Sequence, residues 1–206
     1  IEILNEVTSA KFFDLKNTNY SDWLINGYEG VKEGNPNAKV LIGGFVNPLL
    51  ASEFITTMLK GYSQYYDIIS FHVYELDTDF LSSINLLKSK MSANNVDKPM
   101  WLTETATGFR YDEIPNVNEK IAQGVIKRYV IAFGNGVERV LWWPFTGAPT
   151  PLEYSGTGSS TKTLGLGWVY PKGQGLPIDE FHPRPAYTTY QLMVSKLSGF
   201  SSATKI

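Results

Sequence analysis

The feature that most constrains how this chain folds is a regular alternation of short apolar runs with longer amphipathic stretches. The apolar runs have the length of buried strands, and the longer stretches carry apolar residues at the spacing of one helix face. The expected strands are residues 1–6, 39–45, 66–74, 100–105 and 137–145. The expected helices are residues 20–34, 51–59, 80–91, 116–133 and 185–197. Such alternation predicts an α/β fold with a parallel sheet covered by helices, either doubly wound or closed into a barrel.

Turn and cap residues mark where several of these elements begin and end. The tripeptide NPN at residues 35–37 breaks the first helix. Asn116, followed three residues later by Glu119, is typical of a capping box at a helix start. A Gly- and Thr-rich loop is expected over residues 146–167. Because no repeat, low-complexity tract or linker separates these elements, residues 1–206 are expected to form a single domain.

The composition is that of an ordinary globular protein and excludes several classes of function. Hydrophobic residues make up 43% of the chain and charged residues 18%. The formal net charge is −2 and there is no basic run, so nucleic acid is not an expected partner. No apolar stretch approaches the ~20 residues that span a bilayer, so no membrane partner is expected. Cysteine is absent, which excludes disulfides and thiolate metal sites and suits a secreted or a cytoplasmic protein equally.

Polar or aromatic side chains stand at the ends of four of the expected strands. They are Asn5 and Glu6 on the first strand, His72 and Tyr74 on the third, Thr103 and Glu104 on the fourth, and Trp142 and Trp143 on the fifth. The carboxyl ends of parallel strands meet at one edge of a sheet or barrel, and parallel α/β proteins build their sites there. We therefore expect these side chains to converge on one site.

Taken one at a time, these residues have ordinary structural interpretations. A single Glu6 is more often a solvated carboxylate, His72 a core histidine, and Tyr74 or Trp143 a packing residue. Glu2 has the same strand parity as Glu6 and is either a buried acid behind the site or polar filler. The ordered set favours function instead. Two convergent carboxyls suit glycoside hydrolysis, in which one protonates the leaving oxygen and the other attacks the anomeric carbon.

The same motifs, in order, resemble those of the clan A retaining glycoside hydrolases, most strongly families 5 and 39. The resemblance covers nearly the whole chain, from strand four to helix eight of a (β/α)8 TIM barrel. The matching segments are EILNE at residues 2–6 (strand four), FHVY at 71–74 (strand six), WLTET at 101–105 (strand seven), LWWPF at 141–145 (strand eight) and RPAY at 184–187 (entry to the last helix).

The resemblance implies a glycosidase that cleaves β-glycosidic bonds of oligo- or polysaccharides with retention, by double displacement. It implies a carbohydrate substrate and no metal or organic cofactor. The implied roles are Glu6 as general acid/base, Glu104 as nucleophile, Asn5 as a contact to the sugar 2-hydroxyl, His72 and Tyr74 beside the nucleophile, and Trp143, with Trp142 as the fallback, as the floor of the sugar subsite.

The chain departs from this pattern because strands one to three of the barrel have no counterpart. About five βα units make an incomplete barrel whose two edges expose unpaired backbone groups. We expect either a fragment of a longer chain or a second polypeptide that completes the barrel. The missing N-terminal part of the barrel is thus an expected partner, and the chain alone is expected to be poorly active or inactive.

Two other classes of function remain open on the sequence. A non-catalytic carbohydrate-binding protein on a truncated or decayed barrel would keep the Trp143 platform without turnover. A metal-dependent TIM-barrel enzyme would use Glu6 and Glu104 as ligands. The chain contains only two histidines and no Asp/Glu cluster around the motifs, which disfavours the metal site.

Overall fold

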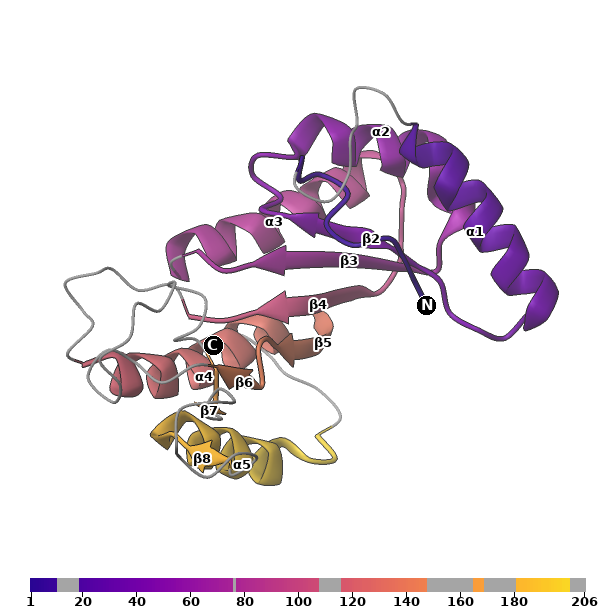
Figure 1. Ribbon diagram of the computed structural model, residues 1–206. Helices are drawn as coiled ribbons and strands as arrows, with labels where there is room; N and C mark the ends of the chain where they lie inside the picture. The colour runs from indigo at the N-terminus through magenta and orange to yellow at the C-terminus, as the bar shows by residue number, and fades with distance from the viewer. Residues whose placement is uncertain (11–18, 76, 108–115, 148–164, 169–180, 201–206) are drawn as a thin grey trace.

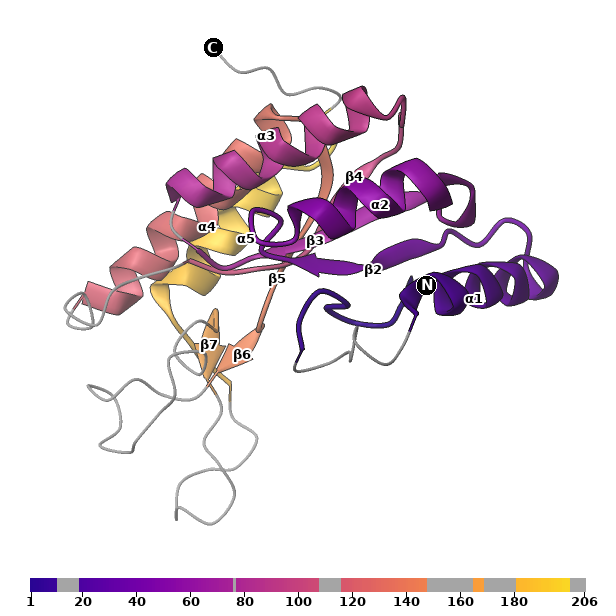
Figure 2. The same ribbon diagram turned by 90° about the horizontal axis from the view of Figure 1, so that it is seen from above.

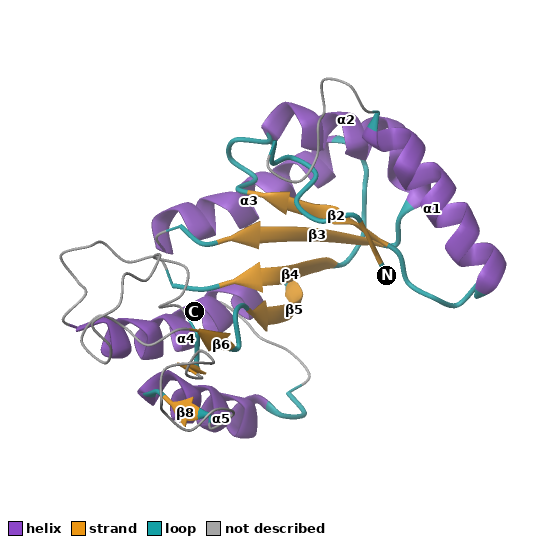
Figure 3. Ribbon diagram, in the orientation of Figure 1, coloured by secondary structure: helices purple, strands orange, loops and turns teal. Residues whose placement is uncertain are grey.

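The computed structural model describes residues 1–10, 19–75, 77–107, 116–147, 165–168 and 181–200 (Figure 1). Its centre is a sheet of five parallel strands. The strands are β1 (Glu2–Ile3), β2 (Leu41–Val46), β3 (Ile68–Val73), β4 (Met100–Thr105) and β5 (Val137–Trp142). The helices are α1 (Tyr20–Gly34), α2 (Ser52–Tyr62), η1 (Ser63–Tyr65), α3 (Asp77–Ala93), α4 (Val117–Gly134) and α5 (Pro185–Leu197). Figure 3 shows the helices flanking the row of strands.

The order of the strands decides between the two folds that the sequence left open. Each strand pairs with the next one along the chain, in the order β1-β2-β3-β4-β5. A doubly wound sheet reverses its order at a switch point, and this sheet does not. Figure 2 shows α2 and α3 on the same side of β2 and β3. Successive crossovers in one direction, with helices on one face, build the wall of a barrel.

The outer face of this wall is buried under the helices. On β3, the residues Ile69, Phe71 and Val73 belong to the apolar core, while His72 lies on the opposite face by strand periodicity. Full burial of one such side chain contributes about 1.5–3 kcal/mol. The helices contribute side chains that are 0% exposed to the same core, among them Leu24, Ile55, Phe80, Ile84 and Leu87.

The helices agree closely with the expected ranges. The bounds expected for α1 and α5 are the observed ones, and Asn19 caps α1 by accepting a hydrogen bond from the Ser21 amide. The start of α4 follows Asn116 as expected, but the Asn116 side chain makes no capping hydrogen bond, so the predicted capping box is wrong. Within the described residues, no helix is both long and apolar enough to cross a bilayer.

The first strand is shorter than expected. A strand was predicted over residues 1–6, whereas β1 ends at Ile3. Leu4 has a φ of 65° and Glu6 a φ of 48°, both in the left-handed region. A left-handed residue cannot continue a strand, so the chain leaves the sheet here and carries Glu6 into a turn.

A small second sheet lies in the C-terminal part of the chain and was not predicted. It consists of β6 (Thr146–Gly147), β7 (Gly167–Trp168) and β8 (His182–Pro183), in that order. Its strands have two residues each, which is too short to leave a periodic signal in the sequence. Part of the loop expected over 146–167 lies outside the described residues, from 148 to 164.

Candidate active site

Glu104 reaches the inner face of the sheet because β4 has an irregular register at this point. Phe71 pairs with Leu102, but His72 pairs with Glu104, so Thr103 is an extra residue on β4. An extra residue in one strand forms a β-bulge, which re-aims the neighbouring side chains. Thr103 and Glu104 both reach the His72 ring as a result, with Thr103 Oγ1 3.1 Å from Nε2 and Glu104 Oε2 3.7 Å from Nδ1.

His72 is the group that joins the two carboxyls expected to be catalytic. Its side chain is 0% exposed, and Nδ1 lies 3.2 Å from Glu6 Oε1. The side chains of Glu6 and Glu104 are 12% and 23% exposed, so both reach solvent from a mostly enclosed position. One ligand atom from each of the three residues lies within 4.8 Å of the other two. The structure thus brings Glu6, His72 and Glu104 together in one cluster of contacting side chains.

Glu6 reaches this position from a turn that follows β1. Its φ of 48° places it in a region that costs a residue other than glycine about 1–3 kcal/mol. The amide of Ser9 donates a hydrogen bond to the Glu6 carbonyl at 2.7 Å and closes the turn. A non-glycine residue stays in this conformation only where the surrounding structure holds it in place, and such residues cluster at active sites.

Tyr74 approaches Glu104 from the end of β3. Its hydroxyl donates a short hydrogen bond to Glu104 Oε2. Burial, followed by this hydrogen bond and the charge of Glu104, raises the pKa of the Tyr74 phenol well above its usual value. Tyr74 therefore keeps its proton at any ordinary pH and acts as a fixed donor to the Glu104 carboxylate.

Comparison with solved structures finds the same arrangement of elements in glycoside hydrolases. The chain is similar to a GH39 β-xylosidase from Caulobacter crescentus, with 17% identity, 94% of this chain covered and a TM-score of 0.65. It is also similar to a family 39 glycoside hydrolase from the gut symbiont Bacteroides cellulosilyticus WH2, with 17% identity, 96% coverage and a TM-score of 0.66. The chain spans 41% of the length of each of these two chains. The chain has the fold of part of the (β/α)8 barrel of these glycoside hydrolases.

The fold class expected from the sequence, a (β/α)8 barrel present in part, is therefore confirmed. A third neighbour, the GH39 enzyme from Xanthomonas axonopodis pv. citri, is 15% identical, with 94% of this chain and 40% of that chain covered and a TM-score of 0.63. No family model matches the sequence, and no curated protein matches it.

The structure separates the two tryptophans at the end of β5, Trp142 and Trp143. Trp143 is 44% exposed, and its ring meets that of Tyr74 edge to face with centroids 6.0 Å apart. Trp142 is 8% exposed and packs in a core cluster with Tyr129 of α4. The exposed ring beside the carboxyls is thus Trp143. Asn5, the remaining predicted contact, is exposed in the turn next to Glu6.

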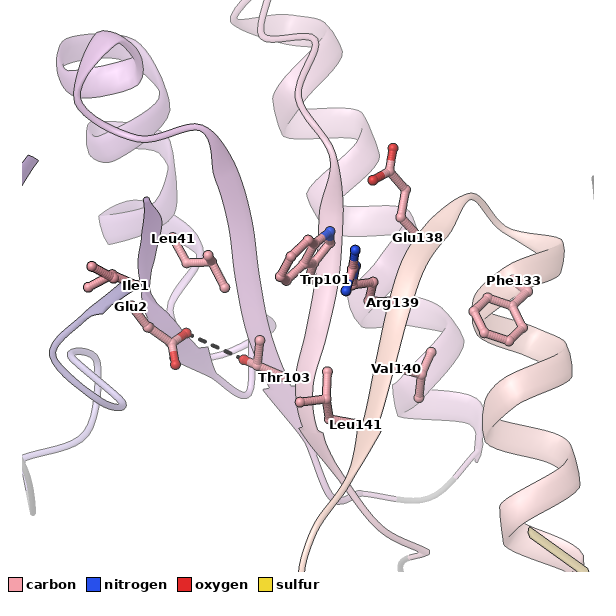
Figure 4. Close-up of a pocket in the computed structure, with 10 residues that line it drawn as sticks. All are labelled: Ile1, Glu2, Leu41, Trp101, Thr103, Phe133, Glu138, Arg139, Val140 and Leu141. Atoms are coloured by element: carbon pink, nitrogen blue, oxygen red, sulfur yellow. Dashed lines mark hydrogen bonds between the residues drawn. The ribbon is translucent and has the colours of Figure 1, made fainter. Parts of the chain in front are cut away.

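Below the carboxyls, the barrel interior is open between β1 and β5. A hollow of about 740 Å³ lies here, and its lining includes Glu2, Trp101 and Arg139 (Figure 4). The Arg139 guanidinium lies over the Trp101 ring, 4.5 Å from its centroid. Side chains of β1, β4 and β5 point into this hollow, which is the position of a barrel core.

Gly44 on β2 is a site residue that the sequence reasoning missed. A Cβ atom at this position would lie 2.5 Å from His72 Nε2, so only glycine lets the imidazole pack against the β2 backbone. The register of β2 against β3 is also irregular between Ile42 and Phe45. The signal was present as the pair Gly43-Gly44 inside an otherwise apolar strand, because glycine in a strand often marks a close approach or a bulge.

We expect Gly44→Ala to destabilise the protein by about 1–3 kcal/mol, because the added methyl group must displace the His72 ring. Urea unfolding of the chain measures the change. Gly30→Ala in α1 is the matched control, since a Cβ there meets nothing within 4 Å. It should leave stability unchanged or raise it by up to about 1 kcal/mol. Equal stability of the two variants would show that His72 does not pack against β2.

The three central side chains also form the one potential metal cluster found among the described residues. Glu6, His72 and Glu104 offer two carboxylate oxygens and one imidazole nitrogen within 4.8 Å. Such a donor set suits divalent transition metals, and it adds His72 to the two glutamates expected as ligands. A chelator therefore belongs among the controls of any activity assay.

Proposed function

We propose that this chain carries the catalytic pair of a retaining β-glycosidase, with Glu104 as nucleophile and Glu6 as general acid/base. The observation that carries the proposal is the spacing of the two carboxyls, whose nearest oxygens lie within 4.8 Å. Retaining enzymes hold their carboxyls about 5–5.5 Å apart, whereas inverting enzymes need about 6.5–9.5 Å to admit a water molecule. The short spacing supports direct attack by one carboxylate on the sugar.

The hydrogen bonds support Glu104 as the nucleophile. Tyr74 donates to Glu104 and is held protonated, which stabilises the ionised carboxylate and orients it. Glu6 lies closer than Glu104 to the imidazole of His72, with Oε1 3.2 Å from Nδ1 against 3.7 Å for Glu104 Oε2. The imidazole can accept or donate a proton. A nucleophile must be ionised, which suits Glu104, the carboxylate that accepts from Tyr74. An acid/base must exchange a proton, which suits Glu6 beside the imidazole.

The reaction then has two steps. Glu104 attacks the anomeric carbon and forms an ester, while Glu6 gives its proton to the departing glycosidic oxygen. Glu6, now ionised, takes a proton from water, and the resulting hydroxide displaces Glu104 from the sugar. Each step inverts the anomeric centre, so the product retains the configuration of the substrate. Trp143, exposed beside Tyr74, offers an aromatic face on which the sugar ring can pack.

We propose a β-xyloside as the first substrate to test, because a structural neighbour is a β-xylosidase.

We also propose that the barrel is active only when further strands complete it. Among the described residues, β1 and β5 each pair on one side only, and the hollow between them lacks a packed layer. The missing N-terminal part of a barrel, in the same chain or another one, fits both features.

The test is the stereochemistry of hydrolysis of an aryl β-xyloside and of other aryl β-glycosides, followed by proton NMR. The β-anomer of the product should appear first and mutarotate afterwards. A 2-deoxy-2-fluoro glycoside should label Glu104 covalently, and peptide mass spectrometry identifies the labelled residue. Initial release of the α-anomer, or a label elsewhere, would contradict the proposal. Sugar-dependent Trp fluorescence without hydrolysis would favour a carbohydrate-binding protein. Activity lost on chelation would favour a metal site at Glu6, His72 and Glu104.

A further inference from the structure

Two polar groups lie behind His72, on the side away from the catalytic carboxyls. Thr103 Oγ1 is 3.1 Å from His72 Nε2, and the same hydroxyl lies 3.4 Å from Glu2 Oε1. Figure 4 shows Glu2 reaching from β1 towards Thr103 on β4. The chain of contacts therefore runs from Glu2 through Thr103 to His72 and on to Glu6, and the proposed mechanism uses only its far end.

The chemistry of these groups gives the chain a direction. An ionised carboxylate only accepts hydrogen bonds, so the Thr103 hydroxyl must donate to Glu2. The lone pairs of the Thr103 oxygen then face Nε2, which must carry a hydrogen to make a bond. The Gly44 amide also donates to Glu2 Oε1, at 3.0 Å, and fixes the carboxylate that starts the chain.

We infer that Glu2 and Thr103 are positioning residues that keep a hydrogen on Nε2 of His72. This inference rests on the proposed glycosidase function. With Nε2 occupied, Nδ1 is left to share one proton with Glu6, either as an acceptor from the protonated acid or as a donor to its carboxylate. Glu2 thereby sets how readily that shared proton leaves, and so the pH range in which Glu6 can act as the acid.

The direction of the effect follows from charge. Among the described residues, the titratable groups that contact the His72 ring are Glu6, from the turn after β1, and Glu104, from β4. Glu2 of β1 reaches the ring through Thr103, and Tyr74, which follows β3, lies beyond Glu104. On the other side of the ring, β2 contributes the Gly44 backbone. The negative charge of Glu2 opposes loss of the shared proton, and so does the hydrogen bond from Nε2 to Thr103. Removing either one should release that proton at lower pH.

The first test determines which ring nitrogen of His72 carries the hydrogen, and it needs no enzymatic activity. The chain has only two histidines, His72 and His182, so ¹⁵N-histidine spectra of the full chain are simple, and His182→Asn assigns them. The expected result for neutral His72 is a hydrogen on Nε2, with a population that falls several-fold in Thr103→Val. A neutral ring with its hydrogen on Nδ1 in the parent protein would overturn the inference, whether or not the protein hydrolyses glycosides.

The second test is the pH profile of kcat/KM in the form of the protein that hydrolyses an aryl β-glycoside. In Thr103→Val and Glu2→Gln the alkaline limb should move to lower pH by about one unit, the effect of one charge-assisted hydrogen bond. Thr57→Val and Glu33→Gln, on exposed helix surfaces, make the same chemical changes and should leave the profile in place. An unmoved alkaline limb in both site variants would refute the inference while leaving the proposed function intact.

Discussion

Glu104→Ala is expected to lower kcat/KM for an aryl β-glycoside by on the order of 10⁶-fold, the scale seen when a nucleophile is removed from an enzyme. On the proposed mechanism, the variant cannot form the glycosyl ester, because the attacking carboxylate is absent. Tyr74 loses the acceptor of its hydrogen bond but keeps its edge-to-face contact with Trp143. Steady-state kinetics with a nitrophenyl glycoside measures the loss.

Added azide makes this result specific to the role of Glu104. In the space left by the carboxylate, azide should attack the sugar from the same side and give a glycosyl azide of inverted configuration. Glu53→Ala, which removes an exposed glutamate from the first turn of α2, is the control and should keep the parent rate. Normal turnover by Glu104→Ala, or an azide product of retained configuration, would rule out Glu104 as the nucleophile.

Glu6→Ala should slow hydrolysis by about 10²–10⁴-fold for substrates with a poor leaving group, because general acid assistance is lost. Substrates with an activated leaving group need no proton, so their first step should remain fast and the glycosyl-enzyme should accumulate. A burst of aryl alcohol followed by slow turnover is the expected time course in a stopped-flow assay. Azide should speed the second step and give a product of retained configuration.

The two variants together separate the roles of the two carboxyls. Opposite configurations of the azide products are expected from Glu104→Ala and Glu6→Ala, although both residues contact the same imidazole. Identical products from the two variants, or an equal loss with good and poor leaving groups in Glu6→Ala, would contradict the assignment. If these variants identify Glu6 as the acid/base, a shift of the alkaline limb in Thr103→Val or Glu2→Gln can be assigned to the proton that Glu6 delivers.

Much of the fold was predictable because its signals are local. The apolar centre of β3 and the helical spacing of α1 are periodic over enough residues to identify each element. The second sheet could not be predicted, since each of its strands has two residues. The end of β1 at Ile3 was also missed, because nothing in the segment Leu4-Asn5-Glu6 marks a left-handed backbone in advance.

The convergence of Glu6, His72 and Glu104 was predictable from the sequence, and the contacts between them were not. Residues at the ends of strands could be expected to converge, since parallel strands place those ends at one edge. Which atoms meet depends on the β-bulge at Thr103, which turns two successive side chains towards His72. It depends equally on Gly44, whose missing Cβ makes room for the imidazole. Both are consequences of pairing between strands that lie far apart in the sequence.

The sequence by itself determined the alternation of strands and helices, the two glutamates and the order of their motifs. These follow from side-chain chemistry and periodicity along a single segment. Only the tertiary structure decided the direct succession of strands round a barrel wall, the 4.8 Å cluster of Glu6, His72 and Glu104, and the contact from Glu2 through Thr103. The physical reason is that hydrogen bonds form over about 3 Å, and register between strands sets distances on that scale.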